Sequence, residues 1–522
     1  MTTFTENRPT SPAAPSASDS TSTAPSVLGH KGLQFEEALL FEQSSPGACG
    51  VDLPALPAHT PRLGSVKPRG SIGLAELAEP QIVRHYTRLS QKNYAIDSGL
   101  YPLGSCTMKH NPRLNEKLAR LPGLGDLHPL QPVSTVQGAL QLMDELANWL
   151  MQLTGMPAVA MSPAAGAHGE FCGMLAIKAA IKQRGEDQTR TKVLVPESAH
   201  GTNPATAAAL GFSVVPVKAG ADGRVTAAAV RDALSQTGAA QVAAIMLTNP
   251  NTCGLFEREI IEIAAAVHEA GAYFYCDGAN FNAIVGRVRP ADLGVDCMHI
   301  NLHKTFSTPH GGGGPGAGPV VFSDRLAAFV PVPYVIKTAQ GYSLCEQARG
   351  HEPGRLKGFH GQMGMFIRAL AYILSHGADG LHQASGDAVL NANYILARCQ
   401  DVMSAPYPGP CMHEALFDDS FLKDTGVTTL DFAKAMIDEG FHPMTMYFPL
   451  VVHGAMLIEP TESESKQSVD GLIAVLRALA ARAKAGDVAH FTGAPRHTPR
   501  QRLDETKAAR QPVLRWMRGR NG

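Results

Sequence analysis

The chain has 522 residues, 44% of them hydrophobic, which is enough to bury two or three separate cores. Its 45 basic and 46 acidic residues leave a net charge of −1, so the composition gives no electrostatic basis for binding nucleic acid or an anionic membrane surface. No run of residues approaches the roughly 18 to 20 apolar positions that a membrane span needs.

The nine cysteines and twenty histidines indicate neither a disulfide framework nor a metal centre. The cysteines form no Cys-x-x-Cys pair, and in a long chain of mixed composition this is typical of reduced thiols in the cytoplasm. The histidines show no His-Glu-x-x-His or similar spacing, so we predict no metal site.

Residues 1–30 are predicted to be a disordered tail, and residues 31–130 an N-terminal arm. The first 27 residues are mostly Ser, Thr, Pro and Ala, and such a segment cannot offset the entropy that it loses on ordering. It lacks the hydrophobic centre of a secretion signal and, with Arg8 as its one arginine, differs from a mitochondrial presequence. The arm is rich in Pro and Gly, so we expect it to lie on another folded surface.

Compact structure is predicted to begin near Ser134, where residues 134–137 read Ser-Thr-Val-Gln and fit a capping box. Apolar residues then recur every three or four positions over 136–153, which predicts an amphipathic helix. That helix is expected to end at Gly155, ahead of Pro157.

Short apolar segments then alternate with helical ones. The predicted strands are 192–196, 212–217, 243–248, 272–276 and 298–302. Helices are expected at 171–181 and 257–269. This alternation predicts an α/β fold whose mainly parallel sheet is covered on both faces, in a large domain over 131–335.

A smaller C-terminal α+β domain is predicted over residues 336–495. Its candidate strands are 448–452 and 455–460. Residues 496–522 are then a C-terminal extension.

Three polar residues that follow predicted strands suit pyridoxal 5'-phosphate. Asn249 begins the turn after 243–248, Asp277 follows 272–276, and Lys304 follows the strand 298–302. In enzymes with this cofactor, an aspartate at a strand end keeps the pyridine nitrogen protonated, and a lysine binds the aldehyde as an imine. Ligands of parallel sheets bind beyond the carboxyl ends of the strands, so we expect the three side chains at one edge.

Each of these residues also has an ordinary explanation. Lys304 could be a surface lysine before the glycine block 311–316, and Asn249 precedes a proline in what could be a simple turn. Aspartates at strand ends such as Asp277 are common. The regular spacing, 28 residues from Asn249 to Asp277 and 27 from there to Lys304, favours a functional site.

Longer segments resemble one enzyme family. Residues 90–94, 101–109, 164–170 and 199–205, together with the stretches around Asp277 and Lys304, carry the resemblance. They are similar to the pyridoxal-phosphate-dependent glycine dehydrogenase (decarboxylating) family, the P-protein of the glycine cleavage system, and within it to subunit 2 of the split, two-subunit form. The resemblance covers roughly residues 31–520 and implies the aminotransferase-like fold (fold type I) for the large domain.

The resemblance implies a role for each candidate site residue. Lys304 would carry the cofactor, Asp277 would pair with its pyridine nitrogen, and Asn249 would bind its phenolic oxygen. His200 would stack on the pyridine ring, with Thr202 a lesser candidate at the same turn.

The cofactor phosphate needs backbone amides at the start of a helix. Gly166 and Ala167 precede the predicted helix 171–181 and are the best candidates. Cys106 and Lys109 belong to the arm motif and receive no role.

The implied reaction is the decarboxylation of glycine, after which the carbanion attacks the lipoyl disulfide of the H-protein and the aminomethyl group is transferred. The implied partners are subunit 1, in an α2β2 heterotetramer, and the lipoylated H-protein. We expect no nucleic-acid or membrane partner and a cytoplasmic location.

Three alternatives remain. Another enzyme of the same fold, a cysteine desulfurase or an amino-acid decarboxylase, would share Asp277 and Lys304 but lack the arm motif 105–109. A catalytically silent scaffold, as expected of subunit 1, would have lost both residues. A nucleotide-binding α/β protein has little support, since no Gly-x-x-x-x-Gly-Lys-Ser/Thr motif occurs and the strand-like segment 319–322 follows the glycine block where a helix is needed.

Overall fold

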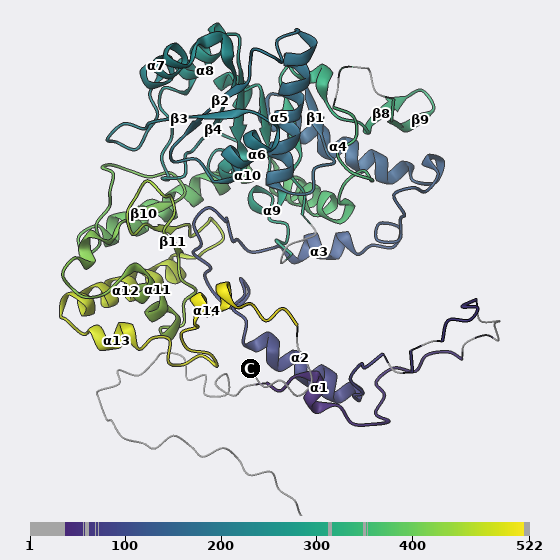
Figure 1. Ribbon diagram of the computed structural model, residues 1–522, viewed down its shortest axis with the longest axis vertical. Helices are drawn as coiled ribbons and strands as arrows, with labels where there is room; N and C mark the ends of the chain where they lie inside the picture. Colours follow the sequence, from purple (N-terminus) through teal and green to yellow (C-terminus); the bar gives the residue numbers. More distant parts are fainter. Residues whose placement is uncertain are drawn as a thin grey trace, which may run out of the picture.

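A seven-stranded sheet forms the centre of the larger of two hydrophobic cores (Figure 1). The computed structural model describes residues 37–55, 57, 62–67, 69–70, 72–311, 316–347, 351 and 353–515. The predicted tail 1–30 lies outside these residues, as do positions 312–315 of the glycine block.

The large sheet has the order β1-β7-β6-β5-β4-β2-β3. Strands β2 to β6 run parallel, whereas β7 runs antiparallel to both β6 and β1. The strands are β1 Ala158–Ala160, β2 Lys192–Pro196, β3 Ser213–Val217, β4 Val242–Thr248, β5 Tyr273–Asp277, β6 Cys297–His299 and β7 Val320–Phe322. The mainly parallel α/β fold predicted from the sequence is confirmed.

Helices cover both faces of this sheet. One face packs on α4 Gln137–Thr154, α7 Ala227–Thr237 and α8 Ile260–Glu269, and the other on α5 Gly166–Gln183 and α6 Thr202–Ala209. All seven residues of β4 are buried, and they alternate between the two faces: Ile245 and Leu247 lie on the side of α4, α7 and α8, and Ala244 and Met246 on the side of α5 and α6. This explains why β4 is an unbroken apolar run rather than an alternating one.

The smaller core surrounds an antiparallel sheet of order β10-β12-β11. Its strands are β10 Ala415–Phe417, β11 Thr445–Met446 and β12 Met456–Ile458, and its helices are α11 Thr429–Asp438, α12 Lys466–Lys484 and α13 Val488–Thr492. Helix α10 Met363–Cys399 links the two cores: residues before its kink at Gly377 pack in the larger one, and those from Ala392 on in the smaller. The predicted domain boundary near residue 335 stays a prediction.

The arm starts outside both cores and ends between them. Helices α1 Leu40–Gln43 and α2 Glu79–Gln91 extend away from the body of the molecule in Figure 1, and α3 Arg113–Ala119 packs on α10. Between α2 and α3, Leu103 forms an antiparallel bridge with Ile458 of the small sheet. The remaining elements are α9 Leu302–Thr305, α14 Glu505–Arg510 and the hairpin β8 Tyr334–Thr338 with β9 Gly341–Cys345.

Most predicted elements occur, with four corrections at their ends, one of which is that the helix predicted over 257–269 starts at Ile260. Ser134 does not cap a helix, since Val133–Thr135 is a short 3-10 turn and α4 starts at Gln137 without a side-chain cap. Helix α5 starts at Gly166, five residues before the predicted helix. The predicted strand 298–302 ends at His299, since Leu302 already belongs to α9.

The predicted strand 448–452 is wrong. Residues in this segment form a turn in which the Val452 N–H donates to the Pro449 carbonyl oxygen, and Pro449 itself has no N–H for a strand ladder. The neighbouring prediction 455–460 is confirmed in its centre, as β12.

A capping box at the start of α11 allows a stability prediction. The Thr428 side chain accepts from the Asp431 N–H, and the Asp431 carboxylate accepts in return from the Thr428 N–H at 3.0 Å. We expect Thr428→Ala to lower the free energy of unfolding of the smaller core by about 1 kcal/mol. Urea unfolding of this variant beside Thr189→Ala, at an exposed threonine outside any cap, would measure it. Equal midpoints would contradict it.

Candidate active site

The predicted site residues lie at the carboxyl ends of three neighbouring strands. Asn249 directly follows β4, Asp277 is the last residue of β5, and Lys304 lies in α9, five residues after β6. The register pairs Thr248 with Asp277, so the first two positions are neighbours across the sheet. The structure therefore brings the three predicted residues to one edge.

Asp277 is a buried carboxylate that its neighbours keep ionised. Burial alone would raise its pKa, but the nearby His299 ring, a hydrogen bond from Asn203 Nδ2 at 3.0 Å, the Ala279 N–H and the Lys304 ammonium together lower it. A buried anion of this kind can hold a cationic N–H donor against it.

Lys304 projects from the short helix α9 toward the arm. Its Nζ donates to the Ser105 carbonyl oxygen at 2.8 Å, and it acts electrostatically on the carboxylate of Asp277. A lysine amine at the edge of the sheet, next to a buried carboxylate, has the character of a nucleophile for a carbonyl group.

The start of α5 lies against the segment that follows β6. A Cβ at Gly166 would lie 2.5 Å from Asn301 Nδ2 and 3.1 Å from His299 Nε2, so only glycine fits there. Gly166 and Ala167 are the first residues of this 18-residue helix, whose leading N–H groups have no partners within the helix. Such a helix start can bind an anion.

Three further candidates follow neighbouring strands: His200 and Thr202 follow β2, and Asn249 follows β4. Thr202 Oγ1 lies 2.8 Å from His200 Nδ1, and the exposed His200 ring meets the Phe448 ring edge-on at 5.6 Å between centroids. Asn249 is 3% exposed; its Oδ1 accepts from the Glu257 N–H at 3.0 Å, and its Nδ2 is a buried donor without a partner. This leaves one amide hydrogen-bond donor available to a ligand.

Two family models match the chain: "Glycine dehydrogenase, C-terminal domain" over residues 384–493 and "Aminotransferase class-V" over residues 172–335. A probable glycine dehydrogenase (decarboxylating) subunit 2 of Caulobacter vibrioides is 65% identical over 515 residues, which is 98% of this chain and 97% of that protein. The protein of the same name from Kosmotoga olearia is 49% identical over 484 residues, or 92% and 99% of the two chains.

This chain belongs to the glycine dehydrogenase (decarboxylating) subunit 2 family.

Solved structures agree on the fold of this glycine dehydrogenase family member. A glycine decarboxylase (P-protein) of the glycine cleavage system, in inhibitor-bound form, matches with a TM-score of 0.65 and 20% identity, covering 81% of this chain and 93% of that one. The glutamate decarboxylase of Lactobacillus brevis matches with a TM-score of 0.61 and 12% identity, covering 83% and 96%.

Sequence analysis missed two groups beside Asp277. His299 Nε2 lies 3.6 Å from the Asp277 carboxylate and 2.7 Å from Asn301 Oδ1, while its Nδ1 meets the Tyr275 hydroxyl. Burial lowers the pKa of His299, while the neighbouring Asp277 carboxylate and the hydrogen bond to Asn301 act in the opposite direction. The signal in the sequence was a histidine after two apolar residues, at the end of the strand that neighbours β5.

Glu170 is the second group. It is 3% exposed, and burial followed by the neighbouring Asp277 raises its pKa to about 7. It accepts a hydrogen bond from Thr202 Oγ1 at 2.6 Å. Thr202 is therefore held between His200 and Glu170, which fixes the loop that carries the candidate ring.

Lys109 ties the arm of this glycine dehydrogenase chain to both cores. It is 4% exposed, and its Nζ donates to Asn282 Oδ1 at 2.8 Å, to the Thr305 carbonyl oxygen at 2.8 Å and to Glu462 Oε1 at 2.5 Å. Thr305 directly follows Lys304, so the arm supports the segment that presents the candidate lysine.

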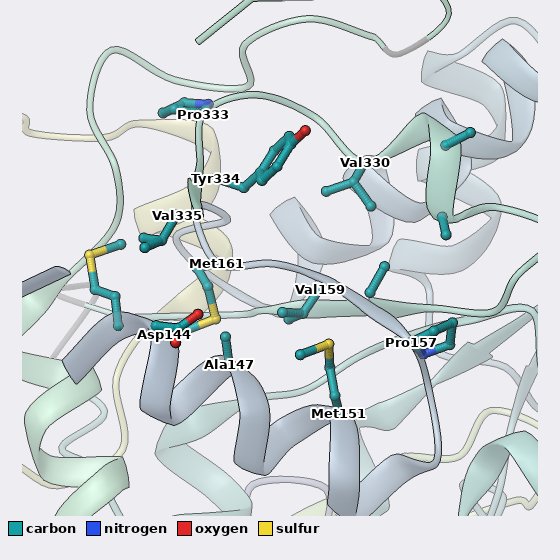
Figure 2. Close-up of a pocket in the computed structure, with 14 residues that line it drawn as sticks. Asp144, Ala147, Met151, Pro157, Val159, Met161, Val330, Pro333, Tyr334 and Val335 are labelled. Carbon is teal, nitrogen blue, oxygen red and sulfur yellow. The ribbon is translucent and has the colours of Figure 1, made fainter. Parts of the chain in front are cut away.

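A cavity of about 350 Å³ lies elsewhere in the molecule, between α4, β1 and the residues that lead into β8 (Figure 2). Met143, Met151, Met161 and Tyr334 are among the side chains that line it. None of its lining residues belongs to the site at the carboxyl ends of β4 to β6.

Within the described residues, no helix is long and apolar enough to cross a membrane.

Proposed function

We propose that this chain decarboxylates glycine with pyridoxal 5'-phosphate and transfers the remaining aminomethyl group to the lipoyl arm of the H-protein, within the glycine cleavage system. The observation that carries the proposal is the buried Asp277 carboxylate at the end of β5 with Lys304, on α9 beyond the next strand, close enough to act on it electrostatically, in a chain 65% identical to its Caulobacter vibrioides relative. A silent scaffold would not need both groups.

The residues present fit the cofactor. The start of α5, at Gly166 and Ala167, would bind its phosphate, and Lys304 Nζ its aldehyde carbon. Asp277 would hold the proton on its pyridine nitrogen. The unpartnered Nδ2 of Asn249 is a suitable donor for its phenolic oxygen.

When bound, pyridoxal phosphate supplies a ring that accepts the electron pair left as the glycine carboxylate departs as carbon dioxide. Asp277 keeps the ring nitrogen protonated, and His200, held by Thr202, would cover the face of the ring. The buried amide of Asn249 would orient the ring through its phenolic oxygen.

Exchange of labelled bicarbonate into the glycine carboxyl group tests the proposal. The purified chain, loaded with pyridoxal phosphate and mixed with subunit 1 and lipoylated H-protein, should catalyse the exchange, and the rate should collapse with H-protein that lacks lipoate. Faster turnover of glutamate, or release of sulfur from cysteine, would favour another enzyme of the same fold instead.

The name of the family implies a partner subunit 1, and we propose that the two form an α2β2 assembly. The arm supports this, because Leu53, Ile72 and Leu74 are 69 to 81% exposed on a segment that extends away from both cores (Figure 1). Such side chains gain stability only by docking on another surface.

All nine cysteines are free thiols, which supports a cytoplasmic location.

Removing the first part of the arm should abolish assembly with subunit 1 without preventing the chain from folding. We expect a chain without residues 1–91, which keeps the 101–109 segment, to fold and bind pyridoxal phosphate but to lose its association with subunit 1. Light scattering of the mixed subunits and the exchange rate would measure the two effects. A chain without residues 1–27 is the control and should behave as the full chain, because that tail is hydrophilic. An assembled, fully active complex from the longer truncation would contradict this role of the arm.

A further inference from the structure

The turn Ser105–Thr107 of the arm is held in an unusual backbone conformation beside Lys304. Ser105 has φ 63° and Thr107 has φ 48°, in the left-handed region that non-glycine residues rarely adopt. Such residues persist where the surrounding structure holds them. Because the Ser105 carbonyl oxygen accepts the hydrogen bond of Lys304 Nζ at 2.8 Å, whatever holds this turn also positions the lysine.

Two buried carboxyl groups hold the turn. The Ser105 N–H donates to Glu414 Oε1, and the Thr107 N–H donates to Glu459 Oε2 at 2.8 Å. Glu414 directly precedes β10 and Glu459 directly follows β12, and the antiparallel register Ala415 with Ile458 brings the two together. Both side chains are 0% exposed.

The remaining carboxyl oxygens have no donor. Glu414 Oε2 and Glu459 Oε1 are buried without a hydrogen-bond partner, as are both ring nitrogens of His413. His413 Nε2 lies 3.8 Å from Glu459 and 4.0 Å from Glu414, too far for a hydrogen bond. One oxygen of each carboxyl group and a nitrogen of His413 all lie within 4.8 Å of one another.

Charge balance points to a proton between the two carboxyl groups. Lys304 is the cation that acts on both of them, whereas the nearby Glu462 is already paired with Lys109. Because Lys304 also acts on Asp277, two bare carboxylates would leave uncompensated negative charge in a dry site. One shared proton reduces that charge and also supplies the missing donor.

We propose that Glu414 and Glu459 share one proton and act together as a latch that seats the Ser105–Thr107 turn against Lys304. The two glutamates are positioning residues, since they act on the lysine through the turn. The inference rests on the proposed function only in taking Lys304 as the lysine that binds the cofactor.

The neighbouring groups leave this pair as the one that titrates near neutral pH. Burial lowers the pKa of His413 to about 3 and raises that of the Cys106 thiol, so both are neutral. Lys109 lowers the pKa of Glu462 in spite of its burial, and Lys304 acts electrostatically on both carboxyl groups of the pair. The Cys253 and Cys411 thiols, on which Glu414 also acts, have pKa values raised to about 12 by burial and are neutral as well.

The latch should weaken as the pH rises. Burial raises the pKa of Glu459 from 4.5 to about 7, and burial followed by Glu459 raises that of Glu414 well above its usual value. Acids whose pKa is higher in the folded state favour folding fully below the unfolded value, and this contribution falls as the pH rises through the folded value. The hydrogen bonds from Ser105 and Thr107 lower both pKa values, but burial beneath the seated turn is the larger effect, so the turn should be held most firmly near pH 5 and progressively less at pH 7 and above.

Hydrogen–deuterium exchange of the segment 103–109 in the full-length chain before cofactor is added, where Lys304 Nζ is free to donate to Ser105, tests the latch. After correction for intrinsic exchange, protection of this segment should fall by up to about tenfold per pH unit between pH 5 and 7. Glu459→Gln should keep the protection and remove this pH dependence, because its amide donates to Glu414 while its oxygen still accepts from Thr107. Glu459→Ala should lose protection at every pH. Glu269→Gln, on the exposed end of α8, is the matched control and should follow the unchanged chain.

Three results would overturn the latch: a flat pH profile in the unchanged chain, a Glu459→Gln chain that unfolds or loses protection as Glu459→Ala does, or one equivalent of bound metal that His413→Ala removes. The last would mean that a cation, rather than a proton, joins the three side chains. Glycine exchange is measured separately. A chain with the expected protection profile but no glycine exchange would refute the proposed function and leave the latch standing.

Discussion

Lys304→Ala is expected to fold normally and to lose glycine exchange by at least about 1,000-fold, equivalent to about 4 kcal/mol of barrier. The Nζ of this lysine lies at the sheet edge, next to the carboxylate of Asp277 and the turn of the arm. An alanine side chain has no amine to hold the cofactor aldehyde as an imine or to displace the product amine from it, so both cofactor retention and turnover should fall.

Borohydride reduction followed by peptide mapping measures the same assignment independently of activity. In the unchanged chain the reduced cofactor should be found on Lys304, and in Lys304→Ala the visible absorbance of the lysine-bound cofactor should be absent. Lys182→Ala, at an exposed position near the end of α5, should retain both label and exchange. A label on another lysine would refute the role of Lys304.

Asp277→Asn is expected to slow glycine decarboxylation by roughly 30- to 1,000-fold, or about 2 to 4 kcal/mol. The pKa of Asp277 lies below its usual value, so its anion is present at neutral pH and would hold a proton on the ring nitrogen. A neutral amide of nearly the same shape keeps the hydrogen bond from Asn203 but cannot balance a positive charge.

Steady-state exchange rates of the variant, with its cofactor content read from absorbance, separate loss of chemistry from loss of binding. We expect the cofactor to stay bound, because the start of α5 and Lys304 are unchanged. Asn203→Ala, which removes one hydrogen bond from Asp277 and leaves the charge, should have a smaller effect in the same direction. Near-normal glycine exchange by Asp277→Asn would mean that Asp277 has only a structural role at the end of β5.

Local sequence pattern was enough to find the strands and the residues at their ends. The runs before Asn249 and Asp277 are apolar throughout because both faces of the parallel sheet are covered, and side chains after such strands must meet at one edge. Glycine at 166 was also recognisable, because a helix start needs close approach, and a Cβ there would collide with Asn301. The roles of these residues stay predictions until the variants are measured.

The same local patterns failed where a neighbour in space decides the backbone. Ser134 has the right spacing for a capping box, yet its segment is a 3-10 turn and Val136 precedes the helix. Gln137 instead bonds to the backbone of Tyr342 in β9, so a contact made by the hairpin replaces the local one. Residues 448–452 are apolar as a strand is, but Pro449 cannot donate and the chain turns.

The sequence alone determined the α/β fold, the strand-end residues Asp277 and Lys304, and the family, because those depend on local periodicity and on contiguous motifs. Only the tertiary structure decided what surrounds them. Ser105 meets Glu414 across 309 positions of sequence and Thr107 meets Glu459 across 352, and no local pattern relates residues so far apart. Burying these groups together raises the pKa of the carboxyl pair, since desolvation and like-charge repulsion exist only once the chain has folded.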